Sequence, residues 1–64
     1  MITVFLATGF EEIEAIAPID IMRRAGLDVH TVSIEDSLMV NGTHGIPVQA
    51  DLMLKQVDFS KVDL

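Results

Sequence analysis

Apolar residues near the start of the chain form a short unbroken run, followed by a longer stretch that is apolar on almost every side. The run from Ile2 to Ala7 contains β-branched residues, which is typical of a strand buried on both faces of a parallel sheet. From Gly9 to Gly26 the apolar positions, placed on a helical wheel at roughly 100° per residue, point in nearly every direction. We therefore predict a strand and then a helix covered on two faces, by the sheet and by a distant part of the protein or a second subunit.

The ends of the predicted helix carry sequence signals of their own. Thr8 and Glu11 have the spacing of a capping box, in which each side chain accepts a hydrogen bond from a free backbone N–H at the helix start. Gly9 favours a tight turn from strand to helix, and Gly26 is placed to end the helix. Pro18 lies well inside the pattern, so we expect it to bend the helix or split it in two.

The second half of the chain predicts a further strand and a hairpin. Val29 to Ile34 alternates and is rich in β-branched residues, so a right-handed crossover would place it parallel to the first strand. Two short arms, Ser37 to Val40 and Ile46 to Ala50, flank an Asn-Gly pair that is typical of a hairpin turn.

The sequence of residues 51–64 predicts less regular structure. Asp51 to Lys55 is expected to be a loop or a short turn of helix, and Phe59 to Lys61 another turn. Val62 to Leu64 has the pattern of the opening of one more strand.

The predicted elements are too few to bury a parallel sheet on both faces. The chain has 64 residues and no cysteine, and His30 and His44 are too far apart in sequence to suggest a metal site, so neither a disulfide nor a metal is expected to stabilise it. We therefore expect residues 1–64 to be the amino-terminal part of a single larger α/β domain, completed by another segment or chain.

The charge of the chain excludes some classes of partner. A net charge of -6 disfavours nucleic acid and anionic membranes, which both require a basic surface. The opening apolar run is too short to span a bilayer and lacks a basic leader, so a cytoplasmic protein is expected. The strand-to-helix turn has one glycine, no following lysine and three nearby glutamates, and it therefore does not predict a phosphate-binding loop or a nucleotide cofactor.

Glu14 is the strongest candidate for chemistry. On the helical wheel it falls beside Pro18, Ile21 and Ala25, and burial among such neighbours would raise the pKa of its carboxyl group until it donates a hydrogen bond near neutral pH. The alternative is that Glu14 lies at the rim and only favours the positive helix start. His30 and His44, on a strand and in a turn, are interpreted as structural or solvated residues.

The order of strand, helix, strand and hairpin, with the sequence GFEEIEAIAPIDIMRRAG, resembles the amino-terminal part of the ThiJ/PfpI family of deglycase-like proteins. The resemblance is most specific in three places, which are the glutamates at 11, 12 and 14, residues 18–20 and residues 22–26. It is weaker in the hairpin and extends loosely to the end, where Val62 to Leu64 resembles the strand leading to a Leu-Pro-Gly-Gly segment.

This resemblance implies a flavodoxin-like three-layer α/β sandwich with a mostly parallel sheet, in a homodimer. We expect neither a cofactor nor a metal. The residues here would form its amino-terminal βαβ unit and a hairpin. It also implies a nucleophilic cysteine at a strand-to-helix elbow, sharing a proton with the glutamate that matches Glu14. This chain has no cysteine, so the thiol must lie outside it.

Two functions follow from the resemblance. In the first, the chain contributes Glu14 to an enzyme of glyoxalase or deglycase type that acts on small reactive carbonyls or glycation adducts. In the second, the fold is a non-catalytic redox-sensing, chaperone, thiazole-biosynthesis-associated or dimerisation module, and the helix serves mainly as a dimer surface through Ile13, Ala17 and Arg24.

Overall fold

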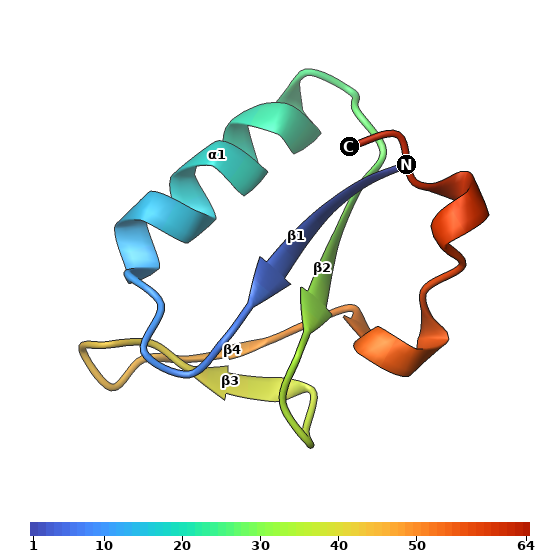
Figure 1. Cartoon of the computed structure of the whole chain (residues 1–64). Coiled ribbons are helices and arrows are strands. Elements are labelled where there is room, and N and C mark those ends of the chain that lie inside the picture. Colours follow the sequence, from blue (N-terminus) through green and yellow to red (C-terminus); the bar gives the residue numbers. More distant parts are fainter.

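The computed structural model describes all 64 residues and contains one crossover unit and one hairpin (Figure 1). The opening apolar run forms strand β1 (Ile2–Leu6), and helix α1 (Glu12–Arg24) returns the chain so that β2 (Val29–Ser33) lies beside β1. The two strands are parallel, with Ile2 opposite Val29 and Leu6 opposite Ser33. The predicted strand, helix and parallel strand are therefore confirmed.

A hairpin and a short third strand complete the regular structure. Strands β3 (Met39–Asn41) and β4 (Pro47–Gln49) pair antiparallel, as the sequence predicted, across a loop formed by residues 42–46. The prediction of a loop or short helix after the hairpin was incomplete, because β5 (Leu52–Met53) pairs in parallel with β2 before a 3-10 helix begins at Leu54. The order of the parallel sheet is β1-β2-β5.

The end of the chain returns to the start of β1. A 3-10 helix spans Phe59–Lys61, and beyond it the Asp63 N–H donates to the Met1 carbonyl (2.8 Å) while the Thr3 N–H donates to the Leu64 carbonyl (2.7 Å). Residues 62–64 therefore lie along the free edge of β1. They do not form the strand that the sequence predicted. The two termini lie side by side (Figure 1).

The start of α1 differs from the predicted capping box. Glu11 is the N-cap, and its side chain accepts a hydrogen bond from the Ile13 N–H (2.9 Å). Thr8 lies further from the helix, and its N–H donates instead to the Glu35 carboxylate (3.1 Å). The capping box was wrong because the turn after β1 extends to Phe10, whose N–H bonds the Ala7 carbonyl.

The rest of α1 agrees with its sequence signals. At Pro18 a bend or a split was expected, and one continuous 13-residue helix passes through this proline, so the split does not occur. Because proline has no N–H, the helix loses one internal hydrogen bond there and keeps its other contacts. Gly26 ends the helix with a φ of +83°, a conformation that glycine adopts without steric cost. The helix is neither long nor apolar enough to cross a membrane.

The core lies where β1 meets the hairpin. Leu6, Val40 and Ala50 are almost completely buried and contact one another, and Phe10 and Ala15 pack against them. On α1 only Ile19 and Glu12 are buried, whereas Ile13 is 74% exposed. One face of the helix is therefore covered by the sheet, as predicted, and the opposite face is open.

Candidate functional site

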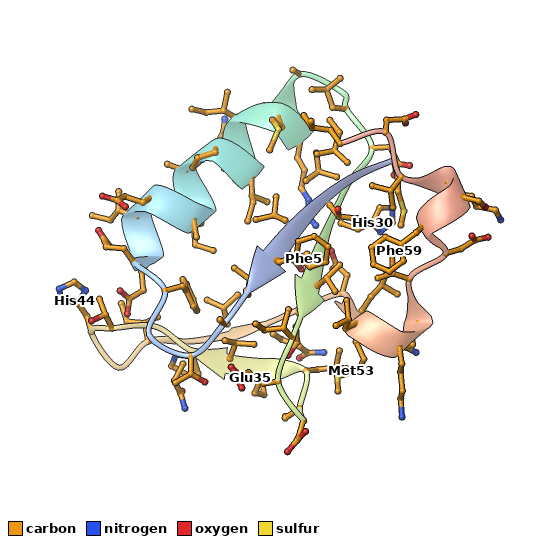
Figure 2. The ribbon with its side chains drawn as sticks, viewed as in Figure 1. Phe5, His30, Glu35, His44, Met53 and Phe59 are labelled. Atoms are coloured by element: carbon orange, nitrogen blue, oxygen red, sulfur yellow. The ribbon has the colours of Figure 1, made fainter.

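The first turn of α1 and the hairpin loop meet beside the carboxyl end of β1. The Gly9 N–H donates to the Asn41 carbonyl and the Thr43 N–H donates to the Phe10 carbonyl, each at 2.8 Å. Gly9 has a φ of +89°, which lets the chain turn sharply from the strand toward the helix. This junction brings together the acidic residues of the helix start and His44 at the hairpin loop (Figure 2).

Glu12 is the central residue of this junction. Its side chain is 8% exposed, and one oxygen accepts hydrogen bonds from the backbone N–H groups of His44 (2.8 Å) and Ile46 (3.3 Å). The other oxygen lies 2.8 Å from Nδ1 of the His44 ring. Because an ionised carboxylate only accepts hydrogen bonds, Nδ1 carries a proton in this contact.

The hydrogen bonds at Glu12 determine its protonation state. Burial alone would raise the pKa of this carboxyl group, but the bonds from the His44 ring and from backbone N–H groups outweigh that effect and lower the pKa from 4.5 to about 2. The same side-chain hydrogen bond, together with the charges of Glu12 and Glu11, raises the pKa of His44 above 6.5 against a smaller opposing effect of desolvation. The pair is thus an ionised carboxylate with an imidazole that holds its proton tightly.

Gly42 provides the space for the Glu12 carboxylate. A Cβ atom placed on Gly42 would overlap the carboxyl group of Glu12, whereas one placed on Gly45 would meet nothing nearby. Gly42 does not have a positive φ, so no backbone constraint requires glycine there. The absence of a side chain at this position is what allows Glu12 to lie against the loop.

Glu14, the residue predicted to be catalytic, lies two residues after Glu12 in the first turn of α1, on the exposed surface of the helix. Its carboxylate makes no hydrogen bond or ion pair with any other residue of the chain, in contrast to those of Glu11 and Glu12. Its predicted apolar neighbours, Ile21 among them, are exposed as well. The face that carries Glu14 is therefore open, and its carboxylate is free to meet a group outside these 64 residues.

The residues predicted to form a dimer surface are also exposed. Ile13 and Ala17, with Ile16, line an apolar depression of about 480 Å³ on α1, which Ile46 of the hairpin extends. Arg24 does not line it and instead donates to Asp20 one turn earlier (3.0 Å). The depression joins the helix to the hairpin loop.

A second hollow lies at the carboxyl ends of β2 and β5, where α/β proteins commonly bind ligands. It has a volume of about 390 Å³ and is lined by Glu35, Asp36, Met53, Leu54 and Lys55. Figure 2 shows Glu35 and Met53 below the ends of the central strands. The hollow is small and open, and none of the residues that line it was predicted to be catalytic.

One group of side chains has the composition of a metal site. Glu11, Glu12 and His44 each offer an atom within 4.8 Å of the others. Both oxygens of Glu12 and one of Glu11 already accept hydrogen bonds, so a cation would have to displace them. We assign no metal or cofactor to this group.

Sequence reasoning missed the contact between Glu12 and His44. His44 was interpreted as structural or solvated, and Glu12 was treated only as part of an acidic helix start. The available signal was Gly42, a loop glycine whose backbone conformation does not require glycine. Its contact, Glu12, lies 30 residues away in sequence, so this signal can be interpreted only when the fold is known. His30 pairs with Asp28 at 2.8 Å on the surface, in keeping with its interpretation as a structural residue.

Comparisons with known proteins agree on one family. A family profile described as DJ-1/PfpI matches residues 1–64. The Arabidopsis thaliana proteins named DJ-1 homolog B and DJ-1 homolog A are each 41% identical over 59 residues. These matches cover 92% of this chain but only 14% and 15% of the relatives, so the chain spans about one seventh of their length.

Solved structures show the same fold. Toxoplasma gondii DJ-1, in a form described as oxidized, superposes with a TM-score of 0.91 at 39% identity, covering 97% of this chain and 34% of the other. A mutant DJ-1 superfamily protein from Salmonella typhimurium, in which a cysteine is replaced by alanine, gives a TM-score of 0.83 at 45% identity, covering 86% and 30%. The predicted α/β fold of flavodoxin-like kind is confirmed for these 64 residues.

Proposed function

This chain belongs to the DJ-1/PfpI family, and we propose that it contributes Glu14 to a cysteine-dependent enzyme acting on small reactive carbonyl compounds or early glycation adducts. The cysteine would come from the remainder of the same domain, because this chain contains none. The observation that carries the proposal is the free carboxylate of Glu14. Of the three glutamates at the start of α1 it is the one with no partner inside the chain.

The uncovered surfaces support a larger domain around this chain. Only 10 of the 64 residues are buried, and the chain measures 31 × 26 × 13 Å, the thickness of little more than one sheet and one helix. Large apolar side chains are exposed on the side of the sheet away from α1, among them Phe5 and Phe59 (Figure 2). Parallel sheets are normally covered on both faces, and further helices of the same domain would bury these residues.

Once that remainder is in place, the environment of Glu14 changes. A carboxyl group that is buried without a positive partner favours its neutral form, so a covered Glu14 would share its proton with the thiol. A protonated carboxyl group donates a hydrogen bond to a thiolate, which stabilises the charged sulfur and lowers the pKa of the thiol. The thiolate can then add to the electrophilic carbon of a carbonyl substrate, while the carbonyl oxygen takes up a proton.

A second copy of the protein is the proposed occupant of the open helix face. Ile13 and Ala17 give this face its apolar character, and Arg24 lies at its far end. Residues of this kind, exposed together on one helix, favour an interface rather than a solvated surface. We place the dimer contact there and the catalytic contact at Glu14.

Replacing Glu14 with leucine in the complete protein tests the catalytic role. The Glu14→Leu variant keeps an exposed residue of similar size on the helix but cannot donate to the thiolate. We expect turnover of methylglyoxal to fall by roughly 100-fold or more, because loss of one proton-donating group usually costs at least that much. Activity would be measured as substrate consumption over time.

Asp28→Leu is the matched control. It removes an exposed carboxylate at the opposite end of the strands and should leave turnover unchanged. Equal activity of Glu14→Leu and Asp28→Leu would refute a catalytic role for Glu14.

A further inference from the structure

We propose that Glu12 is a positioning residue. Its carboxylate, which fits beside Gly42 and bonds to His44, holds the hairpin loop against the first turn of α1 and thereby fixes the position of Glu14. The inference rests on the proposed function of Glu14. Glu12 itself does not reach the reacting atoms, since its carboxylate is buried against the loop.

The buried carboxylate of Glu12 holds the hairpin loop against the helix through several hydrogen bonds. A single carboxylate accepts hydrogen bonds from two backbone N–H groups and one ring nitrogen of the loop, all between 2.8 and 3.3 Å. Hydrogen bonds to an ionised group are stronger than neutral ones. Loss of the carboxylate would leave the N–H groups of His44 and Ile46 without this partner, which makes the contact costly to break.

The position of Glu14 depends on this contact through the helix backbone. Glu12 and Glu14 share the first turn of α1, where backbone N–H groups lack partners within the helix. That turn is stabilised by two side-chain contacts. Glu11 accepts a hydrogen bond from the Ile13 N–H, and Glu12 accepts hydrogen bonds from the hairpin loop. Without Glu12 in place, the first turn would fray more readily and Glu14 would occupy a wider range of positions.

The charged groups around His44 give the contact a pH dependence. Glu12 faces the imidazole directly and Glu11 lies nearby, and both are acidic residues from the start of α1. No basic side chain forms an ion pair with either carboxylate apart from His44 itself. The contact is therefore strongest when His44 is protonated and weakens as it loses its proton.

Gly42→Ala in the complete protein tests this inference, because the added methyl group displaces the Glu12 carboxylate without straining the backbone. Two results are expected. Hydrogen exchange at the His44 and Ile46 amides should quicken by roughly tenfold or more. The pKa of the catalytic thiol should rise, in the same direction as in Glu14→Leu.

Thr43→Ala is the matched control in the same loop. Its side chain is exposed and makes no hydrogen bond, so amide exchange and thiol titration should both stay as in the unmodified protein. The Gly42→Ala and Glu14→Leu double variant separates positioning from general destabilisation. If Gly42 acts through Glu14, adding Gly42→Ala to Glu14→Leu leaves the thiol pKa unchanged.

The outcomes distinguish the two proposals. A thiol pKa that responds to Glu14→Leu but not to Gly42→Ala would overturn the positioning role alone. An equal effect of Gly42→Ala with and without Glu14 would overturn it too, because the effect would not pass through Glu14. A thiol pKa unaffected by Glu14→Leu would instead refute the proposed function.

Discussion

At the scale of single residues, three glutamates within four positions have three different environments. Glu11 caps the helix, Glu12 is buried against the hairpin loop, and Glu14 is exposed without a partner. Glu11 precedes the helix in an extended conformation, whereas Glu12 and Glu14 are both in its first turn, and their side chains leave the helix in different directions. Of the three, only Glu14 has no hydrogen-bond partner within the chain, and it is the one proposed to meet a group outside the chain.

The Glu12 and His44 pair predicts how local stability changes with pH. Because the pKa of His44 is raised on folding, its contribution is complete below 6.5 and is lost as the pH rises through the raised value. Because the pKa of Glu12 is lowered, its contribution is complete above 4.5 and is lost as the pH falls toward about 2. The contact should thus be most stable between pH 4.5 and 6.5.

His44→Asn measures the part due to the imidazole. Asparagine keeps a hydrogen-bond donor near the position of Nδ1 but does not titrate. The thermal unfolding midpoint of the unmodified protein should fall more steeply above pH 6.5 than that of the variant. Parallel curves for the two proteins between pH 6 and 9 would show that His44 contributes no pH-dependent stability.

At the scale of elements, the long periodic segments were predictable and the short ones were not. The apolar run of β1, the helical spacing of α1 and the β-branched residues of β2 identified all three, because each pattern spans at least five residues. Strand β5 has two residues, too few to show any period, and it exists because β2 offers a free edge. Pairing with β2, and not the local sequence pattern, therefore determines that these two residues form a strand.

The same limit applies to the candidate site. Glu14 was identified from its place on the helix and from a family resemblance, and the structure shows it exposed but leaves its role a prediction. The contact of Glu12 with the loop could not be predicted, because it joins residues 32 positions apart in sequence. The helix start was misplaced for a related reason, since Thr8 bonds a residue 27 positions away.

The end of α1 is tied to the sheet through Asp51. This carboxylate accepts hydrogen bonds from the Thr31 N–H (2.9 Å) and hydroxyl (3.1 Å) and from Arg23 (2.7 Å). Burial opposes its charged form, but the bonds from Thr31 and the positive charge of Arg23 lower its pKa overall. One side chain thus joins the helix, β2 and the segment before β5.

Asp51→Ala should lower the free energy of unfolding by about 1 kcal/mol, less than is usual for hydrogen bonds to a charged group, because Asp51 is partly exposed. Urea denaturation of the complete protein measures this change. Asp20→Ala is the control, since its ion pair with Arg24 is exposed and should be worth less than about 0.5 kcal/mol. Equal losses in the two variants would show that Asp51 is no more than a surface ion pair.

At the scale of the whole molecule, the chain is a small parallel sheet with one helix on one side and a separate two-stranded hairpin (Figure 1). The core at Leu6, Val40 and Ala50 is small, and exposed apolar side chains lie on both the helix and the sheet. These two open surfaces have different proposed occupants. The remainder of the domain would cover the sheet and the side of α1 that carries Glu14, and a second copy would cover the side of α1 that carries Ile13 and Ala17.

Ile13→Arg tests the proposed dimer surface in the complete protein. Ile13 is 74% exposed within the chain, so the change should leave the fold intact while placing an unpaired charge in the interface. Sedimentation should show dissociation to monomers, with the dimer weakened by roughly 100-fold or more. Leu27→Arg, an equivalent change at an exposed position after the helix, should remain dimeric.

If Ile13→Arg sediments as the unmodified protein does, this face of α1 does not form the dimer. The role of Glu14 would be unaffected by that result. The two proposals concern different side chains of the same helix and are tested separately.

A crystal structure of the complete protein, with its cysteine reduced, tests the shared proton between Glu14 and a thiol most directly. We predict that the Glu14 carboxyl group lies within hydrogen-bond distance of a cysteine sulfur and is shielded from water by the remainder of the domain. A Glu14 side chain that points into solvent, with no thiol from any chain within reach, would contradict the proposed chemistry.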